Sequence, residues 1–541
     1  MTTNVSDKKN YGKQFFSGVA ILAVSTFIVK VIGMFYKIPM MAYLGAEGMG
    51  YFNSAYDIYS LLFVISTTGL PVAISILVSK NKSQNRFDNI KKIYRISITL
   101  LGALGLVGTL LLAIFHKNIA SMINNNAAAL SILTISPTLF LICLTSAIRG
   151  YFQGNQLMLP TAVSQVIEAL GKLVLGLGFA IIAINQGYDV PTVASLAVLG
   201  VTIGVALSLL YLSLYKLFYK ASKRELDCDT KLESTNSIVK NLVSIAVPIT
   251  ISSSILSLSK IIDMTMILRR LNDIGYTQSQ ANSVYGAYST MAISIYNLPA
   301  TFITAIALPL IPMLTSAIEC KDKAKEHNVV LTSLKLTSII SLPIGLGISV
   351  FSKPLLELLF ASQKSEVEYV APLLSLLGIS VFASSMITIT NAILQAYKQV
   401  QKPIIAMIVG TLVKIISAYL LIGTQNINVY GAPISSLFSV TTIVAINLYY
   451  IIRETGKIKS VYSLFVKPFI AATLSIILGL GFYLLVNSVW ESRLVIVITI
   501  VFVAFSYLLL ALKLRAIDEN EVLMLPKGER ILKILRKAHF M

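Results

Sequence analysis

The sequence has few of the side chains on which metal binding and catalysis usually depend. Its 541 residues include three cysteines, three histidines and one tryptophan, and Cys143, Cys228 and Cys320 show neither CxxC spacing nor a disulfide framework. It contains no GxxxxGK(S/T) phosphate loop and no HExxH cluster. We therefore expect no metal site, no bound cofactor, no ATP hydrolysis on this chain and no enzymatic activity.

Charged residues are also scarce. They make up 13% of the sequence, against about 25% in a typical soluble domain, while 56% of the residues are hydrophobic and the mean hydropathy is +0.79. Apolar runs of about 20 residues, long enough to cross a bilayer core, recur from near Phe15 to near Leu512. These runs predict an all-α integral membrane protein with about fourteen transmembrane helices.

The positive charge is confined to short connections between the apolar runs. The net charge is +20, but the lysines and arginines form no basic domain, so we expect no nucleic-acid partner. Counted from the N-terminus, the odd-numbered connections hold few cations apart from Arg269 and Arg270. The positive-inside rule then predicts a multi-pass protein of the cell membrane with both termini in the cytoplasm, and it requires an even number of helices. The even-numbered connections hold Lys80, Lys82, Arg86, Lys91 and Lys92, the cations of residues 216–240, then Lys321, Lys323, Lys325, Arg453, Lys457 and Lys459.

The two halves of the sequence resemble each other. Residues 30–34 (KVIGM) align with residues 260–264 (KIIDM), and residues 69–71 (GLP) align with residues 297–299 (NLP). Six predicted helices separate the matching positions, so the two repeats have the same orientation and are related by an axis along the membrane normal. We predict two six-helix lobes around a central cavity, followed by two further helices. Their bounds are 1–216 for the N-terminal lobe, 217–240 for a cytoplasmic linker, 241–455 for the C-terminal lobe, 456–512 for the last two helices and 513–541 for a cytoplasmic tail.

Several charged residues fall inside the predicted membrane helices, where each costs at least about 2.5 to 3.5 kcal/mol. Lys30 and Lys37 are nearly two helical turns apart and therefore project from one face of helix 1. Such a cationic face suits an anionic ligand in a wet cavity, although Lys37 also lies where it can extend to the outer interface. Helix 7 repeats the arrangement with Lys260, and Asp263 is one turn away and able to pair with it.

Other polar residues have a binding and a structural interpretation, and both stay open. Arg269 and Arg270 can donate bidentate bonds to phosphate or simply belong to a solvated loop. Glu168 is four residues before Lys172, an order that favours an ion pair within the lobe. Arg149 lies near the cytoplasmic end of helix 4, and Asp57 and Lys414 are further candidates. The predicted substrate-binding residues are Lys30, Lys37, Arg149, Gln165, Glu168, Lys260, Asp263, Arg269 and Arg270.

Two pairs of stretches carry a resemblance to a known family. Residues 147–154 (AIRGYFQG) with 160–168 (PTAVSQVIE), and residues 44–50 (LGAEGMG) with 69–75 (GLPVAIS), resemble the stage V sporulation protein B branch of the multidrug/oligosaccharidyl-lipid/polysaccharide flippase superfamily. The resemblance spans roughly residues 15–455. It implies alternating access and the export of undecaprenyl-diphosphate-linked cell-wall precursors, such as lipid II. Cationic residues of helix 1 line the cavity in its lipid II flippases; Lys30 matches such a position and Lys37 is displaced by about one residue.

The sequence therefore predicts a flippase whose partners are a lipid-linked sugar diphosphate, membrane lipids, and proteins of cell-wall synthesis or sporulation. A cation-coupled multidrug exporter of the same superfamily is the first alternative, and it should place carboxylates rather than lysines in its cavity. A non-transporting scaffold for cell-wall or sporulation proteins is the second. A membrane-bound sugar polymerase would need a sizeable outer loop, whereas the predicted outer loops are short.

Overall fold

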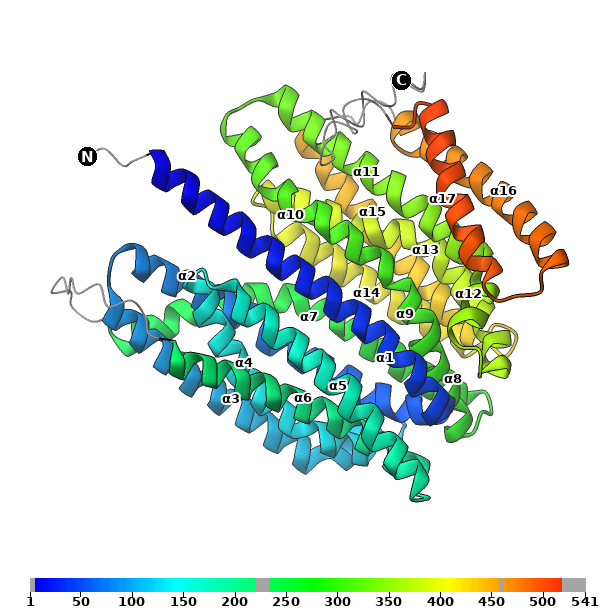
Figure 1. The fold of residues 1–541 in the computed structure, drawn as a ribbon, viewed down its shortest axis with the longest axis horizontal. Helices are drawn as coiled ribbons and strands as arrows, with labels where there is room; N and C mark the ends of the chain where they lie inside the picture. The colour runs from blue at the N-terminus through cyan, green and yellow to red at the C-terminus, as the bar shows by residue number, and fades with distance from the viewer. Residues whose placement is uncertain (1–4, 220–232, 457–460, 518–541) are drawn as a thin grey trace. The chain divides into compact units, whose positions relative to one another are not determined.

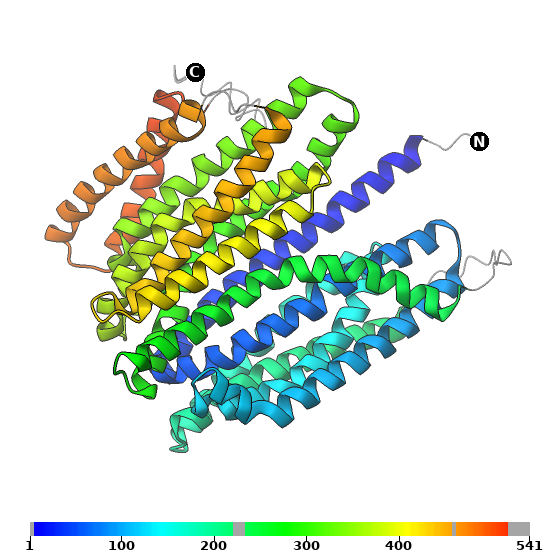
Figure 2. The same ribbon diagram turned by 180° about the vertical axis from the view of Figure 1, so that it is seen from behind.

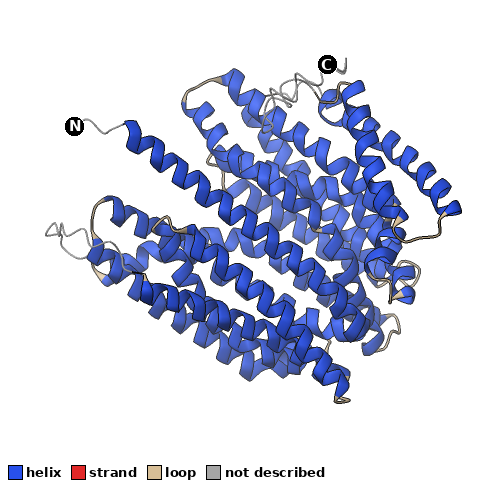
Figure 3. Cartoon of the chain, in the orientation of Figure 1, coloured by secondary structure: helices blue, strands red, loops and turns tan. Residues whose placement is uncertain are grey.

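The computed structural model describes residues 5–219, 233–456 and 461–517. These ranges are helical, with short turns and no strand (Figure 3), which confirms the predicted all-α class. The chain divides into two compact units, Met1–Ala287 (unit 1) and Tyr288–Met541 (unit 2).

In unit 1, α4 packs against α2, α3 and α6, while α5 packs against α1 and α6 (Figure 1). The helices α7 and α8 pack on α1, and α7 also contacts α2. The two units meet between residues 287 and 288, whereas the predicted linker between the two lobes is 217–240. The predicted lobes describe the sequence repeat, and their bounds stay a prediction. The helices of unit 1 are α1 (Val5–Thr67), α2 (Gly69–Ser83), α3 (Phe87–Met122), η1 (Asn126–Ala128), α4 (Ala129–Gly154), α5 (Met158–Asn185), α6 (Val190–Phe218), α7 (Thr235–Asp273) and α8 (Gln278–Ala287).

The first helical run, α1, is 63 residues long and turns at Gly45. A straight helix of that length would extend about 95 Å, roughly three times the thickness of a bilayer core. Gly45 has φ 66° and ψ −179°, a conformation that a residue with a Cβ adopts only at a cost. The glycine thus allows one long hydrophobic run to change direction within α1.

In unit 2, α13 packs against α10, α11 and α15, and α16 packs against α11 and α17. Figure 2 shows α16 and α17 side by side at one edge of this unit. The core includes the fully buried Leu334, Ile389 and Ile393. The helices are η2 (Tyr288–Ala292), α9 (Ile293–Tyr296), α10 (Leu298–Glu319), α11 (Lys323–Val350), α12 (Ser352–Leu359), α13 (Lys364–Ala396), α14 (Gln401–Ile422), η3 (Asn428–Tyr430), α15 (Gly431–Thr455), η4 (Tyr462–Val466), α16 (Lys467–Val489) and α17 (Val495–Lys513).

Within the described ranges, 12 helices are long and apolar enough to cross a membrane. The chain is therefore a multi-pass membrane protein, although the predicted count of about fourteen is not confirmed. One of the 12 is Val24–Ser83, whose 60 residues include the turn at Gly45. The stretch from Gln278 to Glu319 is divided among α8, η2, α9 and α10 and is not one of the 12. Because of these two stretches, the number of fourteen membrane crossings stays a prediction.

The basic connections of each unit meet at one end of that unit. In unit 1, Lys82 Nζ donates to the Asn155 carbonyl at 2.8 Å, and Lys92 Nζ donates to the Glu233 carbonyl at 2.6 Å. In unit 2, Lys398 pairs with Glu319 at 3.8 Å. This is the arrangement that the positive-inside pattern requires. Most of the predicted linker (220–232) and the predicted tail after residue 517 lie outside the described residues.

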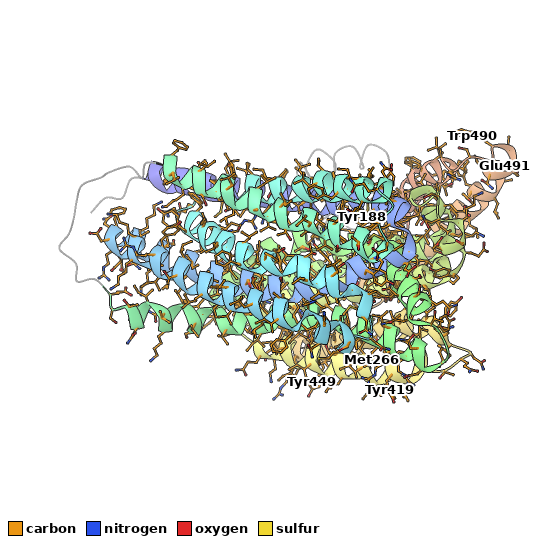
Figure 4. The ribbon with its side chains drawn as sticks, turned by 90° about the horizontal axis from the view of Figure 1, so that it is seen from below. Tyr188, Met266, Tyr419, Tyr449, Trp490 and Glu491 are labelled. Carbon is orange, nitrogen blue, oxygen red and sulfur yellow. The ribbon has the colours of Figure 1, made fainter. Side chains whose placement is uncertain are left out.

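Aromatic side chains mark the connections that carry few cations. Tyr188, between α5 and α6, is 52% exposed, and Trp490, between α16 and α17, is 50% exposed. Figure 4 shows Trp490 and Glu491 at the tip of the α16–α17 hairpin. Tyrosine and tryptophan are enriched where a membrane protein meets the headgroup layer, so these positions fit the ends of membrane spans.

Candidate functional site

Lysines from three helices of unit 1 come together around Lys37. The Lys37 ammonium interacts electrostatically with the Asp57 carboxylate and with the ammonium groups of Lys172 and Lys260. These residues belong to α1, α5 and α7, and Lys37 is half-buried whereas Lys260 is exposed. Lys30 is also exposed and lies nearly two turns before Lys37 on α1. The structure thus brings Lys37, Lys172 and Lys260 together in one cationic cluster, and the Asp57 carboxylate acts on Lys37 as well.

The Lys172 ammonium lies over two tyrosine rings. It is 3.9 Å from the centroid of Tyr56 and 5.1 Å from that of Tyr36. Tyr36 is fixed in turn by α5, since a Cβ on Gly176 would lie 2.9 Å from its hydroxyl. A cation over aromatic faces gains about 0.5 to 2 kcal/mol, so the rings hold the charge of Lys172 in place.

The tyrosines belong to an aromatic stripe that the sequence analysis missed. Phe52 and Tyr56 stack with ring centroids 5.9 Å apart, and the stripe continues through Tyr59 to Phe63 at 5.7 Å per step. The signal was present in the sequence, because these residues follow one another at the helical spacing of three or four.

Arg149 is buried, with 6% of its surface exposed, and its guanidinium bonds three side chains from two neighbouring helices. Nε donates to Ser164 Oγ at 2.9 Å, and Nη2 donates to Glu168 Oε2 at 2.9 Å. Nη2 also donates to Ser208 Oγ at 3.1 Å. Glu168 therefore pairs with Arg149 and not with Lys172, the partner expected from spacing. The pair connects α4 to α5, and the Ser208 bond adds α6.

The remaining predicted residues lie on α5 and α7. Gln165 Oε1 accepts a hydrogen bond from Ser25 of α1 at 3.4 Å. Asp263 is half-buried on α7. At the end of α7, Arg270 Nη1 donates to Asp273 Oδ2 at 2.6 Å, while Arg269 is exposed.

The second half of α1 makes an unusually close contact with α8. A Cβ built on Gly286 would lie 2.0 Å from the Ala46 carbonyl oxygen, and one on Gly50 would lie 2.4 Å from the Asn282 carbonyl oxygen. Asn282 Nδ2 donates to the Glu47 carbonyl at 2.8 Å. The two backbones can approach this closely only because glycine stands on both sides.

Buried polar side chains accompany this contact. Asn125 Nδ2 donates to Asn282 Oδ1 at 2.8 Å and to Ser54 Oγ at 3.0 Å. Nearby on α8, the Tyr285 hydroxyl donates to Asp57 Oδ2 at 2.6 Å. Asp57 thereby connects the α1–α8 contact to the lysine cluster.

Unit 2 contains an apolar cavity and two buried lysines. A cavity of about 380 Å³ lies between α11, α13, η4 and α16, and apolar side chains and glycines line it. Lys335 and Lys414 are almost fully buried, at 4% and 6% exposed. At one end of the unit, the Tyr397 hydroxyl donates to the buried Glu326 at 2.6 Å, and burial followed by this hydrogen bond raises the pKa of Tyr397 well above its usual value. The cavity between α11, α13, η4 and α16 is lined by apolar side chains and glycines, so it suits hydrocarbon and offers no charged group to an anionic headgroup.

The chemistry available in unit 1 is therefore anion binding. Among the residues that the structure describes, no three histidine, cysteine or carboxylate side chains are placed to hold a metal ion. Among the described groups that act electrostatically on Lys37, the ammonium groups of Lys172 and Lys260 outnumber the Asp57 carboxylate. In a membrane-spanning region such charges are retained where a charged ligand or an aqueous path requires them.

Comparisons with known proteins agree with the fold. The chain is 25% identical over 413 residues to the lipid II flippase MurJ of Bacillus subtilis (strain 168), a match covering 74% of this chain and 76% of that protein. It is 26% identical over 427 residues to the stage V sporulation protein B of the same organism, covering 78% and 80% respectively.

Solved structures lead to the same architecture. A lipid II flippase MurJ in an inward closed conformation superposes with a TM-score of 0.67 at 16% identity, covering 91% of this chain and 98% of that one. An inward-facing multidrug resistance MATE family transporter gives 0.66 at 16% identity, covering 81% and 98%. The MatE family model matches residues 248–420. The model of the polysaccharide biosynthesis protein family matches residues 15–318, and this chain belongs to that family within the multidrug/oligosaccharidyl-lipid/polysaccharide flippase superfamily of transporters.

Proposed function

We propose that this transporter carries a lipid-linked sugar diphosphate from the cytoplasmic to the outer leaflet. The observation that supports the proposal most is the lysine cluster of unit 1, in which Lys37 interacts with Lys172 and Lys260. A diphosphate carries the opposite charge and accepts hydrogen bonds from several ammonium groups at once. Lys30 extends the same face of α1 and meets the ligand as it enters. The lipid tail stays in the hydrocarbon.

The relatives give this proposal its substrate class. One of them is named as a lipid II flippase, and this chain covers 76% of its length. The headgroup of lipid II or a related precursor is thus the natural candidate for the sugar that is carried here.

A cation-coupled multidrug exporter is the second candidate, and the MatE match at residues 248–420 favours it. A cationic drug needs carboxylates, yet the groups that act electrostatically on Lys37 are two lysines, Lys172 and Lys260, and one carboxylate, Asp57. The balance of charge therefore favours an anionic substrate. A scaffold without transport activity would gain nothing from three lysines, each of which is costly inside a membrane.

Transport by alternating access requires the α1–α8 contact to open and close. In the predicted lobes, α1 belongs to the N-terminal repeat and α8 to the C-terminal repeat, so their separation would open the path on that side. We place this side outside the cell and both termini in the cytoplasm, in agreement with the distribution of basic connections. An inside-negative potential then drives the anionic headgroup outward by about 2.3 kcal/mol per charge per 100 mV.

The test measures lipid II in the outer leaflet of cells in which this protein is depleted and then restored. We expect wild type to restore exposure and the double variant Lys30→Ala, Lys260→Ala to fail, although it reaches the membrane in equal amount. The matched control is Lys80→Ala, Lys91→Ala, which removes two exposed lysines from the α2–α3 region.

Each result has a defined meaning. Rescue by the Lys30, Lys260 double variant would refute the cationic binding site. Unchanged lipid II exposure after depletion, together with export of a cationic dye by wild type, would instead support the drug exporter. Failure of the control double variant would show that charge loss alone disturbs the protein.

A further inference from the structure

A lysine at the end of α6 is enclosed by tyrosines from two other helices. The Lys216 ammonium is 3.4 Å from the ring centroid of Tyr151 in α4 and 4.9 Å from that of Tyr94 in α3. The two rings contact each other, with centroids 4.9 Å apart. One positive charge is therefore held where three helices meet.

The packing of these helices allows Lys216 to reach both rings. α4 packs against both α3 and α6 (Figure 1). Lys216 reaches from α6 to Tyr94 of α3, so its side chain crosses the face of α4 and both tyrosine rings lie beneath the ammonium. A lysine near a helix end usually extends its ammonium into water, whereas Lys216 is half-buried with its ammonium over two aromatic rings.

The surroundings are basic on one side and apolar on the other. Arg95 follows Tyr94 and is exposed. Lys82 donates to the Asn155 carbonyl at 2.8 Å, four residues beyond Tyr151. Of the carboxylates near this end, Asp88 already pairs with Lys91 at 2.9 Å. On α6, Leu214, Leu217 and Phe218 are 44%, 77% and 81% exposed, as expected for side chains that face lipid.

We propose that the Lys216 patch, made of Tyr94, Tyr151 and Lys216, binds the phosphate of an anionic membrane phospholipid. The Lys216 ammonium supplies charge, and the phenol hydroxyls of Tyr94 and Tyr151 are further hydrogen-bond donors. Tyrosine and lysine together are characteristic of the headgroup layer, and basic pockets between transmembrane helices bind anionic headgroups there. The exposed apolar side chains of α6 lie beside the patch, where the acyl chains would run.

This site is separate from the transported lipid. The lysine cluster around Lys37 belongs to α1, α5 and α7, whereas the Lys216 patch belongs to α3, α4 and α6. The bound phospholipid would be a resident lipid that holds the ends of α3 and α6 together over α4.

Native mass spectrometry of the purified full chain tests the proposal with phosphatidylglycerol as the probe and phosphatidylcholine of the same acyl length as the neutral control. We expect wild type to retain phosphatidylglycerol preferentially and Lys216→Gln to bind it about fivefold more weakly. Lys216→Arg keeps the charge over the rings and should bind like wild type. Lys80→Gln removes an exposed lysine of α2 and should leave the affinity unchanged.

Three outcomes would overturn the proposal. The first is equal binding of phosphatidylglycerol by Lys216→Gln and wild type. The second is equal weakening by Lys80→Gln, which would show a diffuse charge effect. The third is displacement of phosphatidylglycerol from wild type by equimolar undecaprenyl diphosphate, which would assign the patch to the transported lipid. A Lys216→Gln protein that unfolds is distinguished from a binding defect by its melting temperature, with Lys216→Arg as the folded reference.

Discussion

Gly286→Ala should shift the protein away from the conformation in which α1 and α8 touch. The added Cβ would lie 2.0 Å from the Ala46 carbonyl oxygen and 2.5 Å from the Gly50 nitrogen, both backbone atoms, and ordinary contacts begin at 3.4 Å. The helices must therefore separate, because neither backbone atom can rotate out of the way.

The magnitude follows from two costs. Forcing a methyl group into a packed contact costs about 1 to 3 kcal/mol. Separating the helices also lengthens the bond from Asn282 Nδ2 to the Glu47 carbonyl, which is 2.8 Å, and leaving a buried amide unpaired costs about 1 to 3 kcal/mol. The sum is at least about 2 kcal/mol, which changes the ratio of closed to open molecules more than tenfold.

Cysteine labelling measures this shift. In a background without the three native cysteines, Ala281→Cys places a thiol at a position on α8 that is fully buried. We expect a membrane-impermeant maleimide to label it at least about tenfold faster when Gly286→Ala is present. The matched control is Gly178→Ala, where an added Cβ meets nothing within 4 Å. Equal labelling rates in the Gly286→Ala and Gly178→Ala proteins would refute the reasoning.

Three further predictions follow from single contacts of unit 1. Glu168→Ala leaves the buried Arg149 guanidinium without its carboxylate and should destabilise the protein by about 3 to 5 kcal/mol, seen as a lower melting temperature; a change below about 1 kcal/mol would argue that the pair at 2.9 Å is not structural. Lys172→Met should abolish lipid II exposure in the complementation assay while it lowers stability by no more than about 2 kcal/mol, and unimpaired export would remove Lys172 from the binding cluster. Tyr285→Phe deletes only the hydroxyl that donates to Asp57 at 2.6 Å and should cost about 1.5 to 3 kcal/mol in thermal unfolding, whereas an unchanged melting temperature would show that water replaces the bond.

The membrane fold was predictable from sequence because it depends on local properties. Long apolar runs must be helical in a bilayer, since the hydrocarbon offers no partner to backbone N–H and C=O groups. Cations cluster in alternate connections because short loops rich in lysine and arginine stay in the cytoplasm, and the charge of a short loop is also a local property of the sequence. These signals predict two helices within Val24–Ser83, whereas the position of the turn between them, at Gly45, comes from the structure.

The family signatures were likewise readable in the sequence, while the internal repeat stays a prediction. The match of residues 15–318 to the polysaccharide biosynthesis protein family agrees with the resemblance drawn from residues 147–154 and 44–50. Motifs of this kind are contiguous, so they can be recognised in the sequence without any knowledge of how the helices pack.

The partners of the charged residues were decided only by tertiary structure. Spacing along α5 favoured a pair between Glu168 and Lys172, but Arg149 of α4 lies closer to that carboxylate and leaves Lys172 to the rings of Tyr36 and Tyr56. Lys37 and Lys260 are more than two hundred residues apart, and only the packing of α7 on α1 brings them together. Helical periodicity shows which face of a helix a side chain occupies, whereas the energy of a charge in a membrane depends on what the neighbouring helix places opposite that face.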